Sequence, residues 1–82
     1  MQSKSFKLNI LSLEKELYTG EAVSLNINAE DGELTVLSGH APIMAVIKKG
    51  PIRAKKADGT ELKIHADRGL LKVFHDQASV MI

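Results

Sequence analysis

The sequence predicts an all-β fold, an antiparallel β-sandwich or flattened barrel in a single domain spanning residues 1–82. Apolar and polar side chains alternate with a period of two along most of the chain, as expected for strands with one buried face. Turn residues recur at intervals of roughly eight to ten residues, which gives about eight or nine short strands. No segment has a convincing amphipathic helical pattern, so the alternation dominates the prediction.

The N-terminal third contains two predicted strands and an ambiguous segment. Residues 6–10 alternate apolar and polar side chains and predict the first strand. Residues 11–18 have apolar side chains four apart, which suit a short helix, but Gly20 follows within about two turns and favours a turn and a short strand instead. Residues 23–29 show the clearest alternation in the chain and predict the most secure strand.

The middle of the chain is divided by glycine and proline. A turn at Asp31-Gly32 leads into a short apolar run at residues 34–37, which ends at the Ser-Gly-His-Ala-Pro segment 38–42. A second apolar run occupies residues 43–47 and ends at the Lys-Lys-Gly-Pro segment 48–51. Glycine permits positive φ and proline lacks a backbone donor, so these segments are predicted to end strands.

The C-terminal third predicts four more strands. Residues 52–54 alternate, and Asp58-Gly59 is a dipeptide typical of a hairpin with a type I′ turn. Residues 62–66 alternate in the same way. Residues 70–74 carry apolar side chains on both faces, which indicates a strand covered on both sides or a bulge, and residues 78–82 predict the last strand.

Composition excludes several classes of protein. The chain has 82 residues, of which 44% are hydrophobic and 26% charged, as in an ordinary soluble domain with one modest core. The absence of cysteine excludes disulfides, thiolate metal sites and cysteine nucleophiles. No signal segment is expected at residues 1–7, and the longest apolar run, residues 43–47, is far too short to cross a bilayer. Neither a dinucleotide fingerprint nor a phosphate-binding loop occurs.

The three histidines are the first candidates for chemistry. His65 and His75 are each close to an aspartate, but the spacings match no metal-ligand motif, and both are expected to be exposed. His40 lies in a Gly-His-Ala-Pro segment, where its ring either braces the loop or faces a partner. No catalytic, cofactor-binding or metal-binding residue is predicted, although a small metal-dependent enzyme built on the histidines stays as an alternative.

Two charged clusters suggest binding. Five basic residues fall within nine positions, at Lys48, Lys49, Arg53, Lys55 and Lys56. This cluster carries the alternative hypothesis of a stand-alone nucleic-acid-binding β-barrel. Single-strand binders also need aromatic side chains for base stacking, and none is near the cluster. A strand edge protected by lysines explains the cluster as well.

The acidic trio Glu30, Asp31 and Glu33 is the second cluster. Three carboxylates in one turn could attract a cation, but hard cations need six or more oxygen ligands. A solvated turn is therefore the simpler interpretation.

The apolar run at residues 43–47 needs cover on both faces. Successive side chains of a strand point to opposite faces, so Ile43, Ala45 and Ile47 cannot share a face with Met44 and Val46. Either the strand is sandwiched inside the domain, or one face is left for a protein partner with Met44 as an adaptable contact.

The motifs of the central stretch resemble a known family. Asp31-Gly32-Glu33-Leu34, Gly39-His40-Ala41-Pro42-Ile43 and Ile47-Lys48-Lys49-Gly50 are similar to the N-terminal domain of the epsilon subunit of F-type ATP synthases. Thr35, Ser38 and Lys49 depart from the residues usual in the family, as does Asp67-Arg68-Gly69. The family's C-terminal helical hairpin is expected to be absent, because the sequence ends with the predicted sandwich.

The resemblance implies a ten-stranded sandwich that serves as a non-catalytic rotor subunit in the central stalk. Its partners would be the gamma subunit and the ring of c subunits, with ion flow coupled to ATP synthesis and no cofactor or small-molecule substrate. It would lie peripherally on the cytoplasmic face of a bacterial plasma membrane or an equivalent membrane. The c-ring contact would use Glu30, Asp31, Glu33 and His40, and the gamma contact would use Ser12, Met44, Ala45 and Pro51.

Overall fold

The computed structural model describes residues 4–82 as a fold of strands alone. The strands in chain order are β1 (Phe6–Leu11), β2 (Glu16–Ala29), β3 (Gly32–Leu37), β4 (Ile43–Ile47), β5 (Gly50–Lys56), β6 (Glu61–Ala66), β7 (Gly69–Val73) and β8 (Gln77–Met81). Within this described part of the chain, no helix is long and apolar enough to span a membrane. The predicted all-β class is confirmed.

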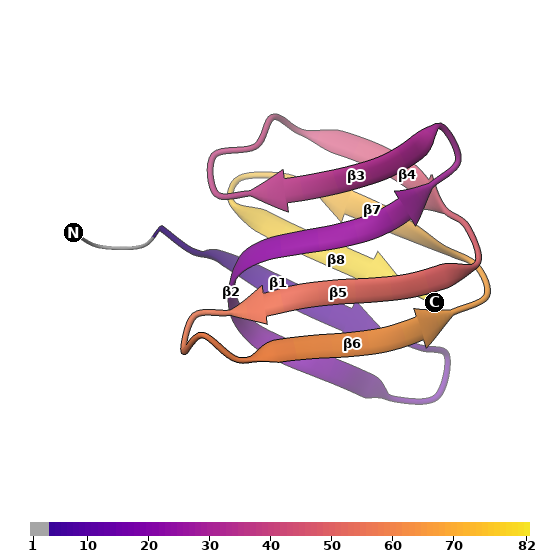
Figure 1. Cartoon of the computed structure of the whole chain (residues 1–82), viewed down its shortest axis with the longest axis horizontal. Helices are drawn as coiled ribbons and strands as arrows, with labels where there is room; N and C mark the ends of the chain where they lie inside the picture. The colour runs from indigo at the N-terminus through magenta and orange to yellow at the C-terminus, as the bar shows by residue number, and fades with distance from the viewer. Residues whose placement is uncertain (1–3) are drawn as a thin grey trace.

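The strands form two layers that join into a flattened barrel (Figure 1). In the front layer of Figure 1, β3 pairs with β2, which pairs with β5, which pairs with β6. In the back layer, β4 pairs with β7, β7 with β8, and β8 with β1. The layers are joined by β2, which also pairs with β1 and, at a single residue pair, with β4. Among these pairings only β1 with β8 is parallel.

The strand β2 belongs to both layers. Its first half pairs with β1 as far as Ala22, where the register with β5 also shifts, and its second half pairs with β5 and β3. The Tyr18 hydroxyl donates to the Glu21 carbonyl oxygen at 3.0 Å, and a Cβ on Gly20 would lie 2.6 Å from that hydroxyl. Two segments predicted as separate strands therefore run on as one bent strand. The described residues accordingly form eight strands, fewer than the ten or so that the family resemblance implied.

The core follows the predicted alternation. Every residue buried in the described structure is apolar or glycine, and no polar or charged side chain is buried there. Burying apolar surface without orphaned polar groups is the main stabilising contribution available to a domain of this size. The buried apolar residues are Phe6, Leu8, Ile10, Ala22, Leu25, Ile27, Val36, Ile47, Ile52, Ala54, Ala66, Leu71, Val73, Ala78 and Val80.

The hairpin predicted at Asp58-Gly59 forms, but with a different turn. The Gly59 N–H donates to the Lys56 carbonyl at 3.0 Å, and the Lys56 N–H donates to Thr60 at 2.8 Å. Only Gly59 has positive φ in this loop, at +93°, whereas a type I′ turn needs positive φ at both central residues. The loop is therefore a three-residue connection with glycine in the last position, and the type I′ prediction was wrong.

Candidate protein-interaction surfaces

The acidic trio occupies the β2–β3 turn. Ala29 pairs with Gly32, so Glu30 and Asp31 form a two-residue turn, and Glu33 follows at the start of β3. All three acidic side chains are exposed, as expected. The Glu30 N–H donates to the Val46 carbonyl oxygen at 3.0 Å, which holds the turn beside β4. Three carboxylates are thus collected at one end of the sandwich.

His40 lies at the other end of β3. The His40 N–H donates to the Leu37 carbonyl at 3.1 Å, and its ring Nδ1 lies 2.7 Å from the Ala41 carbonyl. Because a carbonyl oxygen only accepts, Nδ1 carries the proton in this contact and the ring braces the loop. Glu33 begins the strand and His40 follows its end, so the structure does not bring the four predicted c-ring residues together.

A turn that sequence reasoning passed over supports the His40 loop. His75 and Asp76 form the β7–β8 turn with φ values of 52° and 54°, the left-handed geometry of a type I′ turn. The Asp76 Oδ1 accepts a hydrogen bond from the Gly39 N–H at 2.7 Å, and the Asp76 carbonyl accepts one from Lys7 at 3.0 Å. Asp76 therefore ties the β3–β4 loop to the back layer. Asparagine and aspartate tolerate positive φ better than most residues, which was the available signal.

The predicted gamma-contact residues lie on two strands and in one turn, and they do not share one face. Met44 is 65% exposed on the outer face of the back layer. Ala45, its neighbour on β4, points the other way and packs against the core. Pro51 lies on β5 in the front layer, opposite His65 of β6. Ser12 lies in the β1–β2 turn, where its hydroxyl oxygen is 3.2 Å from the Lys15 N–H. Only Met44 and Ser12 therefore border the outer face of the back layer.

An apolar row crosses the outer face of the back layer. Val46 pairs with Leu70, Leu70 with Met81, and Met81 with Leu11, so one register line runs through β4, β7, β8 and β1. Leu70 is half-buried and the other three are classed as exposed. Leu11, Met81 and Leu70 of this row also line a groove of about 550 Å³. Its lining is Leu11, Ser12, Leu13, Arg68, Gly69, Leu70, Met81 and Ile82.

The sequence held part of the signal for this row. Residues 43–47 and 70–74 are the two segments with apolar side chains on both faces, and the structure pairs them as β4 and β7. Leu11 and Met81 were not predicted as surface residues, because their alignment with Leu70 depends on strand register.

The outer face of the front layer is polar. One register line crosses it from Thr35 through Asn26 and Arg53 to Lys63, and the Asn26 amide donates to the Thr35 hydroxyl at 2.9 Å. Leu37, 55% exposed at the end of β3, is the one large apolar side chain that is exposed on this layer within the described residues. The outer face of the back layer therefore differs in carrying an apolar row, beside a more polar line of Met44, Lys72, Ser79 and Asn9.

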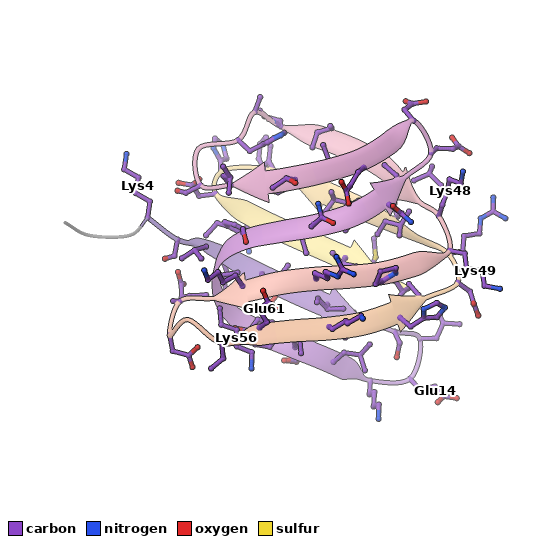
Figure 2. The ribbon with its side chains drawn as sticks, viewed as in Figure 1. Lys4, Glu14, Lys48, Lys49, Lys56 and Glu61 are labelled. Carbon is purple, nitrogen blue, oxygen red and sulfur yellow. The ribbon has the colours of Figure 1, made fainter. Side chains whose placement is uncertain are left out.

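The basic cluster does not form one patch. Lys48 and Lys49 project from one end of the sandwich and Lys56 lies at the opposite end of β5 (Figure 2). The Lys56 ammonium lies 5.3 Å from the centre of the Tyr18 ring, so it is engaged within the fold. Seven residues of strand separate the ends by roughly 20 Å. The observation that favoured a nucleic-acid binder in the sequence is thus dispersed in space.

His40 and His75 lie on neighbouring loops, which the hydrogen bond from the Gly39 N–H to Asp76 joins, whereas His65 lies on another strand, β6. His65 is exposed on β6, and His75 is exposed in the β7–β8 turn, where its ring contacts Phe74 with centroids 4.1 Å apart. Among the residues that the structure describes, no three histidine, aspartate or glutamate side chains gather as a metal site would require.

Comparisons with known proteins agree with this fold. An ATP synthase epsilon chain of Dichelobacter nodosus (strain VCS1703A) is 35% identical over 79 residues, which cover 96% of this chain and 55% of the relative. The chain thus spans about half the length of this curated relative.

Two solved structures share the fold at low sequence identity. A chain in the central stalk and c-ring structure of the Tetrahymena thermophila mitochondrial ATP synthase superposes with a TM-score of 0.80 at 10% identity, covering 99% of this chain and 65% of that one. A chain in the Euglena gracilis mitochondrial ATP synthase OSCP/F1/c-ring structure superposes with a TM-score of 0.89 at 14% identity, covering 99% of this chain and 52% of that one.

The sequence model of a family described as "ATP synthase, Delta/Epsilon chain, beta-sandwich domain" matches residues 5–82. That match takes in all eight strands. The chain therefore belongs to the ATP synthase Delta/Epsilon chain beta-sandwich domain family.

Proposed function

We propose that the chain is a non-catalytic subunit of the central stalk of an F-type ATP synthase, acting as a single domain of residues 1–82 that binds the gamma subunit and the c-ring. Family membership supports the assignment to this complex. The two structural neighbours come from structures of the central stalk with the c-ring and of OSCP, F1 and the c-ring of ATP synthases. On this proposal the subunit is peripheral, on the cytoplasmic face of a bacterial plasma membrane or an equivalent membrane.

The observation that carries the proposal is the apolar row on the back layer. Val46, Leu70, Met81 and Leu11 offer a continuous apolar strip on a hydrogen-bonded sheet, which suits a protein interface better than a small-molecule site. We assign the gamma contact to this face, with Met44 beside the strip and Ser12 at its far end.

The acidic turn is the proposed c-ring contact. Glu30, Asp31 and Glu33 are exposed at one end of the sandwich, where a polar loop of another subunit can reach them. His40 lies at the other end of β3 and holds its own loop, so in this proposal it positions that loop and the acidic turn makes the contact.

A pair of matched substitutions tests the gamma contact. Met44→Asp places a charge on the apolar face, and Leu37→Asp makes the same kind of change on the polar face. Both side chains are more than half exposed, at 65% and 55%, so neither change should unfold the protein. We expect Met44→Asp to abolish co-purification with the gamma subunit and Leu37→Asp to leave it intact, with circular dichroism to confirm folding.

Equal retention of gamma by both variants would overturn the assignment of this face. Equal loss in both, with both folded, would show that the two faces are not distinguished by the partner. Met44→Leu serves as a further control, because it keeps an apolar side chain of similar volume and should bind gamma as the parent chain does.

A further inference from the structure

The backbone of β4 has a free edge. β4 pairs with β7 along its whole length, but on its other side it pairs with β2 only through Ile47 and Ala29. The Val46 carbonyl accepts from Glu30 on that second side, and backbone groups of alternate strand residues point the same way. The N–H and C=O of Met44 therefore point away from β7, toward the free side.

The free side opens on a groove between the two layers. β3 pairs with β2 and with no other strand among residues 4–82, so its second edge is also unpaired. The groove between β3 and β4 has a volume of about 320 Å³, at the small end for a ligand site. It is lined by residues 29–34 and 43–46. Two unpaired strand edges thus border one groove.

The side chains of β4 are incompletely covered on both faces. Ile43 and Ala45 are half-buried on the inner side, while Met44 and Val46 are exposed on the outer side. A neighbouring strand would cover both sets at once, because its own side chains alternate in the same way. The five-residue apolar run is thereby accounted for as a strand that lacks one neighbour.

The β4 edge lacks the protection that the edge of β6 has. β6 forms the edge of the front layer and carries Glu61, Lys63 and His65 on its exposed side. Charged residues on an edge strand discourage pairing with another chain. Residues 43–47 of β4 contain no charge and no proline. The edges of β6 and β4 are therefore built differently, and the β4 edge is the less protected of these two.

We propose that the groove between β3 and β4 binds an extended polypeptide segment, which adds to the free edge of β4 as an antiparallel strand. The segment would carry apolar side chains next to Met44 and Val46 and basic residues at its N-terminal end. That end lies beside the acidic turn, whose Glu30, Asp31 and Glu33 are the only charged residues among the described residues that line the groove. Main-chain hydrogen bonds supply affinity and the turn sets the direction.

This inference goes beyond the proposed stalk function. The gamma contact is assigned to the outer face of the back layer through side chains, whereas strand addition uses the backbone edge of β4. Either can hold without the other, and the test below uses peptides, not a subunit of the complex.

The test is a titration of the full chain with a synthetic peptide. The probe is acetyl-Lys-Lys-Val-Thr-Val-Thr-Val-amide, monitored through the backbone amides of the ¹⁵N-labelled protein. We expect the Met44 and Val46 amide signals to move most. Two further peptides carry N-methyl groups on alternate residue sets, Val or Thr. The backbone N–H groups of only one residue set face β4. Only the peptide methylated on that set should therefore bind more weakly, by about tenfold or more, because it loses those hydrogen bonds.

Protein variants provide the second arm. Met44→Pro removes the N–H that faces the groove, without removing a bond to β7, and Met44→Leu keeps it. We expect loss of peptide binding in the first and retention in the second. An acidic probe with Glu-Glu in place of Lys-Lys should bind more weakly than the basic one.

Three outcomes would overturn the proposal. Equal binding of both N-methylated peptides would show contact through side chains alone. Absence of binding at millimolar peptide would remove the site. Concentration-dependent dimerisation that protects the same amides would mean that a second copy of the chain, not a basic segment, occupies the groove.

Discussion

The two outer faces of this sandwich differ in one feature, an exposed apolar row that crosses the back layer. The back layer shows the apolar row of Val46, Leu70, Met81 and Leu11, and the front layer shows the polar line from Thr35 to Lys63. Folding needs only the inner face of each layer to be apolar. The exposed apolar row is therefore not explained by folding, which is why we propose the outer face of the back layer as the gamma contact.

The largest expected effect separates the inner and outer side chains of β7. Leu71 is fully buried, so Leu71→Ala should lower the free energy of unfolding by about 2–5 kcal/mol. Leu70 is half-buried on the outer face, so Leu70→Ala should cost about 1 kcal/mol or less. Urea denaturation measures both.

Gamma binding should show the reverse order: Leu70→Ala should weaken co-purification with the gamma subunit more than Leu71→Ala does. Leu70→Ala removes part of the apolar row, and Leu71→Ala, at a temperature where it is folded, leaves the row in place. If Leu70→Ala destabilised the protein as much as Leu71→Ala did, the apolar face would be part of the core and the comparison between the faces would fail.

A smaller effect is expected at the acidic turn. Replacing Glu30 and Glu33 by glutamine and Asp31 by asparagine should weaken assembly with the c-ring a few-fold, because the charges are exposed and screened by salt. The loss should shrink at high ionic strength. Glu14→Gln with Glu16→Gln is the control, because it removes two exposed carboxylates elsewhere on the chain, one in the β1–β2 turn and one at the start of β2. Equal weakening by the control would point to net charge alone.

The smallest effect concerns Asp58, in the front-layer hairpin. The hydrogen bond from the Thr60 side chain, followed by that from its N–H, lowers the pKa of Asp58 below its ordinary value of 3.8. The ionised form stabilises the hairpin, so this contribution is present above pH 3.8 and is lost as the pH falls through the lowered pKa. Thr60→Val should raise the pKa, as followed by carboxyl NMR, and leave gamma binding unchanged.

Much of the fold could be predicted from the sequence because alternation and turn residues are local. The strand around residues 23–29 and the turn after Leu11 were both found in this way. The bend of β2 was not, because a strand that continues through Gly20 into the second layer depends on the Tyr18 contact. The turn at residues 57–59 likewise depends on loop length, which a dipeptide does not specify.

The candidate site was predicted less completely, for reasons of geometry. Met44 and Ala45 are neighbours on one strand and must face opposite ways, so a contact set containing both cannot form one surface. Glu33 and His40 are separated by the length of β3, roughly 20 Å. Register between distant strands aligned Leu11 with Met81, and no local pattern contains that register.

Binding of the gamma subunit to the apolar row of the back layer is the contact on which the proposed function depends. Its most direct test is a methyl NMR spectrum of the isotope-labelled chain, recorded with and without the cognate gamma subunit. We predict that the methyl signals of Leu11, Val46, Leu70 and Met81 shift or broaden on binding, while those of Leu37 on the front layer do not. Perturbation of Leu37 with those four signals unchanged would mean that gamma binds the front layer instead.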